Sequence, residues 1–372
     1  MKIIHFSDTH LGISIENTSR ENDFYDNFKK VIDDIIFFRP DFVIHSGDLF
    51  HYSKPGNKAL SVAIEGFLKL NEAGIKTIII AGNHSTPRLL STTHPFSILE
   101  KIPNLYTFYE QKLDNIEFKN INFVCLPHIY NEELFREELG NSTNLKKENK
   151  LNILISHFGL QSKEYDEYTD EISGVNILMQ DLEKIKTFDY VALGHYHKNF
   201  CIGKNICYSG SIEKTSFNQK DYKIGYNIVS FEPELKVEFK ALETRKMLDL
   251  GKINCENIYS MDELLNLLEE NKTKESISDA IVKIFFYNIK NKLALEFDDN
   301  KLSKIFKNAF YFEYKKDFYR EDRNENQNYE IDISNDDFIK NIFDDFINDY
   351  QINDENIDKI KLKAELKEMF NK

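Results

Sequence analysis

Long apolar runs are absent from this 372-residue sequence. No run approaches the ~18 consecutive apolar residues that a membrane-spanning helix needs, which argues against an integral membrane protein. A signal peptide is missing as well, because a strand-like segment begins directly after Met1. We therefore expect a cytoplasmic protein.

Closely spaced cysteines are also lacking. The four cysteines stand at positions 125, 201, 207 and 255, and no two of them form a CxxC motif. Metal sites and redox motifs depend on such spacing, and secreted disulfide frameworks come with a secretion signal. The sequence thus predicts reduced, mostly buried thiols.

Positive charge is not in excess. The formal net charge of −14 argues against a protein that binds nucleic acid through its whole surface. The negative charge is concentrated in one segment. Residues 321–358 carry a net charge of −11, residues 359–372 a net charge of +3, and the first 320 residues a net charge of only −6. Bound divalent cations would neutralise part of this acid, so the charge does not exclude a nucleic-acid substrate.

Five short apolar runs, rich in β-branched residues, each end in side chains that bind metal or phosphate. The runs and the residues that follow are 2–7 with Asp8-Thr9-His10, 42–44 with Ser46-Gly47-Asp48, 76–80 with Gly82-Asn83-His84, 152–156 with His157, and 189–193 with Gly194-His195-Tyr196-His197. Strands that are apolar on both faces suit a buried sheet, and ligands of α/β folds gather beyond the carboxyl ends of the strands. The sequence therefore predicts that these polar residues meet at one edge.

This set of side chains suits a centre of two metal ions that cleaves phosphate esters. Such a centre needs one shared oxyanion ligand, which holds the ions roughly 3.5–4 Å apart, and neutral ligands that keep the site attractive to an anion. We expect Asp48 to be the shared ligand. One ion would be held by Asp8, His10, Asp48 and His197, and the other by Asp48, Asn83, His157 and His195. The donors suit manganese, iron or zinc without choosing between them.

Six further histidines lie outside this ligand set. His84 and His51 are near the predicted centre, where each either stabilises charge and protonates a leaving group or orients a ligand. The other four, within strands or loops, are expected to be structural residues with satisfied hydrogen bonds. These four are His5, His45, His94 and His128.

The rest of the chain predicts more than one domain. A helix over 57–70 is apolar on more than one face, so it is either sandwiched within the fold or offered to another subunit. The first domain is expected to close near residue 235. Residues 236–313 then alternate strands and helices without a histidine, which favours recognition rather than chemistry.

The C-terminal part of the sequence is polar before it becomes amphipathic. Residues 314–334 are predicted to be a solvated linker. Two amphipathic helices follow within 335–372, and their apolar stripes need a surface to cover them. Docking to another protein is favoured over folding back onto the same domain.

The motif string D-x-H, G-D, G-N-H, H and G-H-x-H resembles that of the calcineurin-like metallophosphoesterases. Within that superfamily the chain looks like the nuclease subunit of the DNA double-strand-break repair complex, the SbcD-type exonucleases. The specific segments are Phe6–Gly12, Gly47–His51, Gly194–His197 and Tyr208–Ser211. One departure is Ser85, where an acidic residue is common in the family.

The resemblance implies an α/β (α+β) fold with a two-sheet sandwich flanked by helices over 1–235. A small α/β capping and DNA-recognition domain would span 236–313, and a helical ATPase-binding segment 335–372. It further implies two divalent metal ions, most often manganese, catalytic roles for His84 and His51, and a homodimer formed by core-domain helices. The activity would be 3′-to-5′ exonuclease on duplex DNA ends and endonuclease on single strands, together with a coiled-coil ABC-type ATPase.

The alternative enzyme is a phosphatase or phosphodiesterase that acts on proteins or small molecules. Protein phosphatases of this superfamily carry Asp-Arg-Gly soon after the shared aspartate, whereas this chain has Leu49-Phe50-His51. A non-catalytic scaffold would predict a missing ligand or a missing His84, and neither is missing.

Overall fold

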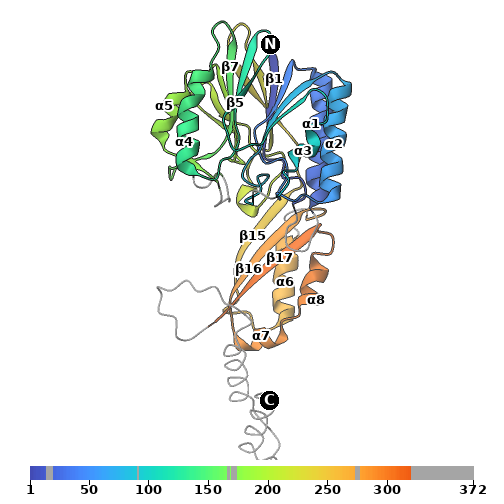
Figure 1. Cartoon of the computed structure of the whole chain (residues 1–372). Coiled ribbons are helices and arrows are strands. Elements are labelled where there is room, and N and C mark those ends of the chain that lie inside the picture. Colours follow the sequence, from blue (N-terminus) through green and yellow to red (C-terminus); the bar gives the residue numbers. More distant parts are fainter. Residues whose placement is uncertain (14–19, 90–91, 166–167, 169–173, 273–276, 320–372) are drawn as a thin grey trace, which may run out of the picture. The chain divides into compact units, whose positions relative to one another are not determined.

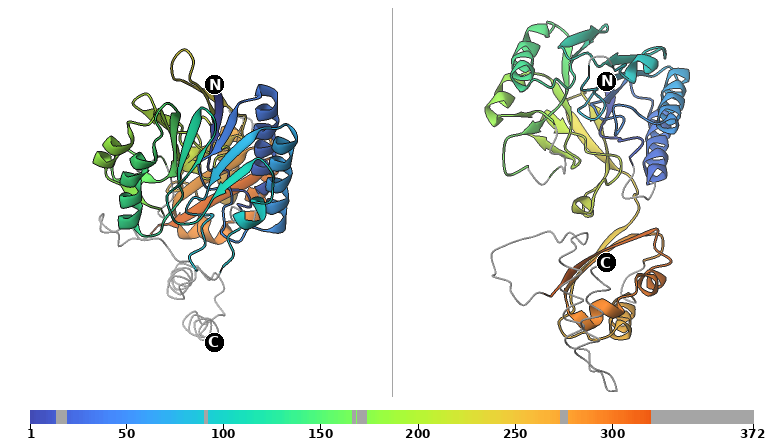
Figure 2. Two further views of the ribbon diagram at one scale, coloured as in Figure 1. Left: turned by 45° about the horizontal axis from the view of Figure 1, so that its top comes forward. Right: turned by 60° about the horizontal axis from the view of Figure 1, so that its bottom comes forward.

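The computed structural model describes residues 1–13, 20–89, 92–165, 168, 174–272 and 277–319 (Figures 1 and 2). The chain divides into two compact units, Met1–Arg245 and the residues from Lys246 onward. The predicted helical segment 335–372 lies outside the described residues, as does most of the predicted linker. None of the helices in the described part is long and apolar enough to cross a membrane.

The first sheet of the first unit is mostly parallel. Its strands, in order across the sheet, are β14 (Lys236–Ala241), β13 (Gly225–Ser230), β1 (Lys2–Phe6), β2 (Phe42–His45), β3 (Lys76–Ile80) and β4 (Leu105–Phe108). Strands β1 to β4 are parallel, and β13 runs antiparallel to β1. The helix over residues 21–38 connects β1 to β2, so the sheet begins with a βαβ unit.

The second sheet brings together strands from the middle of the chain. Its order is β11 (Phe200–Ile202), β12 (Ile206–Tyr208), β10 (Tyr190–Gly194), β7 (Leu151–His157), β6 (Ile121–Leu126) and β5 (Asp114–Glu117). Strands β6, β7, β10 and β12 are parallel. A short parallel pair, β8 (Gly159–Leu160) and β9 (Asn176–Ile177), follows β7.

Helices cover the outer face of each sheet (Figure 1). Helices α1 (Glu21–Phe38) and α2 (Asn57–Glu72) pack on the first sheet, and α4 (Glu132–Asn141) and α5 (Leu182–Ile185) on the second. The short α3 (Phe96–Leu99) precedes β4. Because successive side chains of a strand alternate, Ile4 packs under the helices while Ile3 joins the apolar layer between the sheets. The predicted two-sheet sandwich flanked by helices is confirmed.

Two predictions about the end of this unit are wrong. Strand β14 pairs with β13 in the first sheet, so the unit ends at Arg245 rather than near residue 235. Cys201 and Cys207 form a disulfide rather than free thiols, whereas Cys125 and Cys255 are free and buried. The cause is strand register, since Cys201 and Cys207 stand opposite each other on the antiparallel β11–β12 pair with Cα atoms 4.1 Å apart.

The second unit holds a three-stranded parallel sheet. Its order is β15 (Met247–Asn254), β16 (Ile281–Ile289) and β17 (Tyr311–Phe318). The connecting helices are α6 (Met261–Lys272), α7 (Asn291–Glu296) and α8 (Asp299–Ile305). Alternate residues of β16, such as Val282, Ile284 and Phe286, are fully buried in the core that these helices share. Strand β17 extends to Phe318, so the linker predicted from residue 314 begins too early.

Candidate metal centre

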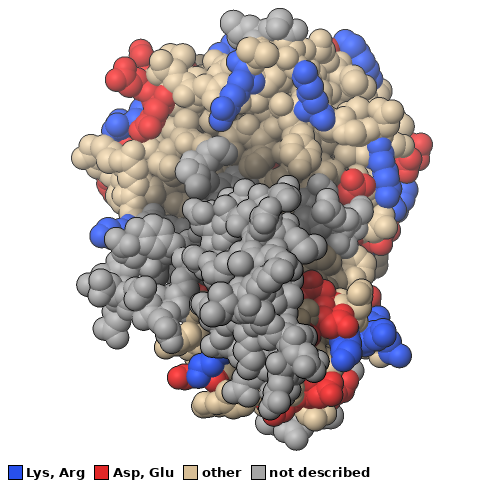
Figure 3. All heavy atoms as spheres, turned by 90° about the horizontal axis from the view of Figure 1, so that it is seen from below, with Lys and Arg blue, Asp and Glu red and all other residues tan. Residues whose placement is uncertain are grey.

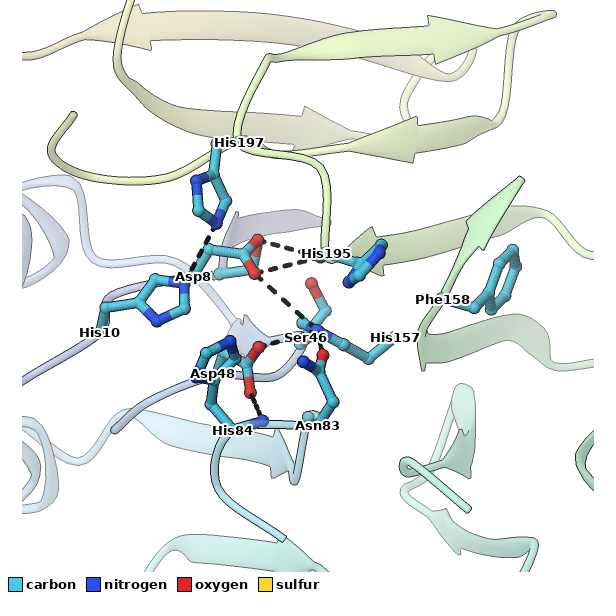
Figure 4. A network of polar contacts seen from close by, with 12 residues as sticks. Asp8, His10, Ser46, Asp48, Asn83, His84, His157, Phe158, His195 and His197 are labelled. Atoms are coloured by element: carbon cyan, nitrogen blue, oxygen red, sulfur yellow. Dashed lines mark hydrogen bonds and ion pairs between the residues drawn. The ribbon is translucent and has the colours of Figure 1, made fainter. Parts of the chain in front are cut away.

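The predicted ligands follow the carboxyl ends of strands in both sheets (Figure 4). Asp8 and His10 follow β1, Asp48 follows β2, and Asn83 follows β3. His157 ends β7, and two histidines follow β10. Because these strands are parallel within each sheet, their carboxyl ends deliver the side chains to one edge of the sandwich.

Backbone hydrogen bonds extend the β1–β2 pairing into the two ligand loops. The N–H of Asp8 donates to the carbonyl of Gly47 at 3.0 Å, and the N–H of His10 donates to that of Asp48 at 3.0 Å. The loops adopt left-handed backbone at Asp8 (φ 50°), His10 (φ 41°) and Asp48 (φ 53°). Such conformations are costly outside glycine and tend to cluster at functional sites, where the surrounding structure holds them.

All seven predicted ligand side chains are buried, and their donor atoms converge. The ligand atoms of Asp8, His10 and His197 lie within 4.8 Å of one another, and so do those of Asp8, Asp48 and His157. Asp8 is common to both groups, whereas the sequence predicts Asp48 as the shared ligand. The Asp48 carboxylate is turned toward His157, with Oδ2 3.0 Å from His157 Nε2.

The two remaining ligands lie beside these groups. Asn83 Oδ1 is 3.0 Å from His157 Nε2. The ring of His195 is 5.5 Å from that of His157 between centroids, and its backbone N–H donates to the Asp8 carboxylate at 3.1 Å. Both residues therefore border the half of the centre that was assigned to the second ion.

Glycines permit this crowding. A Cβ at Gly82 would lie 2.4 Å from Asp48 Oδ1, and one at Gly47 (φ 108°) would lie 2.1 Å from His157 Nδ1. Both strand-end glycines are thus required for the carboxylate and the imidazole to reach their positions.

Hydrogen bonds orient the imidazoles for ligation. His157 donates its Nδ1–H to the carbonyl of Ser46 at 2.8 Å, which turns Nε2 toward Asp48 and Asn83. His197 Nδ1 lies 3.1 Å from Thr215 Oγ1, while its Nε2 lies 3.1 Å from His10 Nε2. Partners of this kind fix the tautomer of metal-binding histidines. The donor set and its burial fit two divalent ions.

Burial and charge shift the acid–base behaviour of the centre. Burial raises the pKa of Asp8 to about 6. Burial by itself lowers the pKa of His157, but the carboxylates of Asp48 and Asp8 outweigh it and raise that pKa to about 9. In the absence of cations, the centre therefore retains protons that an incoming cation must displace.

His84 and His51 stand beside the ligands without belonging to the predicted set. Their rings stack at 4.9 Å, and His84 donates its Nδ1–H to the carbonyl of His51 at 2.9 Å. The N–H of His84 donates to Asp48 Oδ1 at 2.9 Å. His51 Nδ1 lies 3.2 Å from His10 Nδ1. The structure thus brings both histidines to the same rim as the ligands.

The four histidines predicted to be structural differ from one another. His5 has partners at both ring nitrogens, Tyr190 Oη and Ser46 Oγ, each at 2.8 Å. His45 and His94 each have one partnered nitrogen. His128 is 2% exposed, and neither of its ring nitrogens has a partner among the described residues, so the prediction of satisfied hydrogen bonds is wrong for His128. Its isolated place after Pro127 gave no sequence signal for this.

The fold and this cluster define a phosphoesterase of the dinuclear-metal class. Residues 1–199 match the calcineurin-like phosphoesterase family, and the chain belongs to that family. The family resemblance predicted from the motifs is thereby confirmed.

Three relatives of known name show which members of this family the chain is similar to. The chain is 33% identical to the DNA double-strand break repair protein Mre11 of Methanocaldococcus jannaschii over 318 residues, which cover 79% of this chain and 81% of that protein. It is 40% identical over 199 residues to Mre11 of Sulfurisphaera tokodaii, covering 53% and 49% of the two chains. It is 27% identical to the SbcD subunit of the SbcCD nuclease of Staphylococcus epidermidis over 253 residues, covering 62% and 66%.

Proposed function

We propose that this chain is a manganese-dependent DNA double-strand-break repair nuclease. It acts as a 3′-to-5′ exonuclease on duplex ends and as an endonuclease on single strands. The observation that carries the proposal is the convergence of seven buried ligand residues with His51 and His84 on one rim. The names of its Mre11 and SbcCD nuclease relatives support DNA as the substrate.

Residues of the rim have distinct roles in this reaction. Asp8, His10, Asp48, Asn83, His157, His195 and His197 would hold two divalent ions, which supply an activated hydroxide and neutralise phosphate oxygens. His84 acts in its imidazolium form, in which Nδ1–H is held by the carbonyl of His51 and the second proton, on Nε2, is given to the leaving oxygen. His51 stacks on His84 and keeps that ring in place.

The surface is compatible with a local rather than a global DNA contact. Lys and Arg side chains are interspersed with Asp and Glu over the described part of the face in Figure 3. With a net charge of −14, attraction to DNA must come from the metal centre and nearby cations.

The assignment is tested with metal-stripped protein and end-labelled linear duplex DNA. Manganese, magnesium or zinc is added back, and an aryl phosphate serves as the alternative substrate. Manganese-dependent shortening from 3′ ends supports the nuclease. Hydrolysis of the aryl phosphate alone, with the DNA left whole, would assign the chain to a phosphatase or small-molecule phosphodiesterase instead.

Helix α2 is the proposed homodimer contact. It buries one face against the first sheet, while Leu60 and Ile64 at the edge of that face are only partly buried and Leu68, one turn further, is 39% exposed. Leu68→Glu should convert a dimer into a monomer in light scattering after size exclusion. Leu134→Glu on α4, at an equally exposed leucine, is the matched control and should leave the mass unchanged.

The amphipathic residues 335–372 are proposed to bind the coiled-coil ABC-type ATPase. Their stripes, read from the sequence, need an apolar partner surface. Removal of 331–372 should abolish capture of the ATPase in a pull-down and leave metal binding intact, because every predicted ligand precedes residue 198. Full capture by the shortened chain would rule the segment out.

A further inference from the structure

One of the predicted metal ligands, His197, is held by a polar segment that follows strand β12. We call residues 211–219 the Thr215 segment. The N–H of Ser211 donates to the backbone carbonyl of His197 at 3.1 Å, so the segment is attached to the backbone of the ligand itself. The Nε2 atom of the His197 ring lies 3.1 Å from His10 Nε2, within the metal centre (Figure 4). The other ring nitrogen, Nδ1, faces the Thr215 segment.

Two side chains of the segment meet His197 Nδ1. Thr215 Oγ1 lies 3.1 Å from this nitrogen, and Gln219 Nε2 lies 2.9 Å from it. A neutral histidine that binds an ion through Nε2 carries its proton on Nδ1, and that N–H needs an acceptor. An amide nitrogen only donates, whereas a hydroxyl oxygen offers two lone pairs. Of the two contacts, Thr215 Oγ1 is therefore the acceptor.

Gln219 orients the Thr215 hydroxyl. Its Oε1 accepts the backbone N–H of Thr215 at 3.0 Å, and this contact decides which end of the amide is the oxygen, because the opposite assignment would set two donors against each other. Its Nε2 donates to Thr215 Oγ1 at 2.8 Å, which leaves the second lone pair of that oxygen for His197. Gln219 is 1% exposed, so water does not compete for these hydrogen bonds.

A buried ion pair anchors the segment to helix α1. The Glu213 carboxylate lies 3.1 Å from the Arg20 guanidinium, and its second oxygen accepts from Asn27 Nδ2 at 2.8 Å. Arg20 also donates to the carbonyl of Lys214, the residue before Thr215. The backbone that carries the hydroxyl is therefore fixed from outside the metal centre.

We infer that Thr215 is the positioning residue of the metal ligand His197. Its hydroxyl accepts the Nδ1–H of His197 and so presents Nε2 to the ion that is assigned to Asp8, His10 and His197, while Gln219 holds the hydroxyl in place. Removal of such a partner typically changes metal affinity about 10–100-fold. The inference rests on the proposed two-metal function and adds the residue that sets the affinity of one ion and not of the other.

Calorimetric titration of manganese into the metal-stripped full-length protein measures both binding steps. Thr215→Val keeps the shape of the side chain but removes the acceptor, and one of the two steps should weaken about tenfold. Thr215→Ser keeps the hydroxyl but removes the methyl group, and both steps should match wild type. Thr143→Val, at a half-buried threonine whose hydroxyl donates to the carbonyl of Gly140, is the matched control and should leave both steps unchanged.

A second substitution tests whether the missing group is an acceptor. Gln219→Glu puts a carboxylate oxygen where Nε2 lies 2.9 Å from His197 Nδ1, so residue 219 itself accepts the Nδ1–H. In the Thr215→Val background this change should recover most of the lost affinity, because a carboxylate is a common partner of metal-binding histidines. In the otherwise wild-type chain the gain should be smaller, because Thr215 already supplies the acceptor.

Wild-type affinity in Thr215→Val would overturn the inference. So would a Thr215→Ser variant as weak as Thr215→Val, because packing of the methyl group would then be the cause. Equal gains from Gln219→Glu in the two backgrounds would reduce its effect to charge and would also overturn the inference. If the wild-type protein binds two manganese ions but leaves DNA whole, the nuclease assignment falls while Thr215 keeps its role.

Discussion

Replacement of Asp48 by asparagine tests the electrostatics of the centre most directly. The change keeps the size of the side chain and its acceptor for the N–H of His84 but removes the charge that lies 3.0 Å from His157 Nε2. Without metal, that charge and the Asp8 carboxylate raise the pKa of His157 from 6.5 to about 9 against the opposing effect of burial.

The size of the effect follows from proton linkage. A histidine whose pKa is higher in the folded than in the unfolded state stabilises the fold below the unfolded pKa, and this stabilisation is lost as the pH rises through the folded pKa. For a pKa near 9, the contribution is about 3 kcal/mol near pH 6 and falls to a small fraction of that near pH 9. Asp48→Asn should therefore destabilise the metal-free protein strongly near pH 6 and little near pH 9.

The assay is urea unfolding of chelator-treated wild type and Asp48→Asn at the two pH values, with metal content measured in parallel. We expect the difference in the free energy of unfolding to shrink as the pH rises, and the variant to bind fewer ions than wild type. A destabilisation that is equal at both pH values would refute the ion-pair reasoning. Wild-type stoichiometry and affinity in the variant would refute the role of Asp48 as a ligand.

Three further predictions concern the same unit. His84→Ser should lower DNA cleavage by about 10²–10⁴-fold, the usual contribution of a proton donor, with manganese stoichiometry unchanged; lost metal would make His84 structural instead. Metal binding near pH 7 should release protons, because the pKa of His157 is about 9 in the metal-free protein, and metal affinity should fall below pH 6 as Asp8 protonates. Calorimetry in buffers of different ionisation enthalpy measures the number of protons released. Identical heats of binding in all buffers would contradict the prediction. Arg20→Ala should lower the free energy of unfolding by about 3–5 kcal/mol in denaturant unfolding. The reason is that Glu213, which is 1% exposed and 3.1 Å from the Arg20 guanidinium, would be left as a buried acid without its ion-pair partner. A decrease below about 1 kcal/mol would show that Glu213 takes up a proton without affecting stability.

The sequence determined where the five ligand-bearing strands lie along the chain and which polar residues stand at their ends. Each of these five strands is a largely apolar run, and each candidate ligand lies within a few residues of such a run, so local pattern was sufficient. The convergence at one rim followed because parallel strands share a carboxyl edge. The helix predicted over 57–70 was equally visible from its apolar residues.

Only the tertiary structure decided features that depend on contacts between distant residues. The pairing of β14 with β13 moved the boundary of the first unit to Arg245, and the register of β11 on β12 placed Cys201 opposite Cys207. The Asp48 carboxylate points toward His157. Asp8 is therefore the acid shared by the two clusters of ligand atoms, Asp8–His10–His197 and Asp8–Asp48–His157.

The unpartnered ring of His128 belongs to the same class of feature. The sequence shows a histidine after a strand, but whether its nitrogens meet protein atoms depends on which loops pack around it. Local pattern fixes the secondary structure and the chemistry that each strand end carries. The satisfaction of buried polar atoms is set by packing between segments far apart in the chain, and for that reason it emerged only from the folded structure.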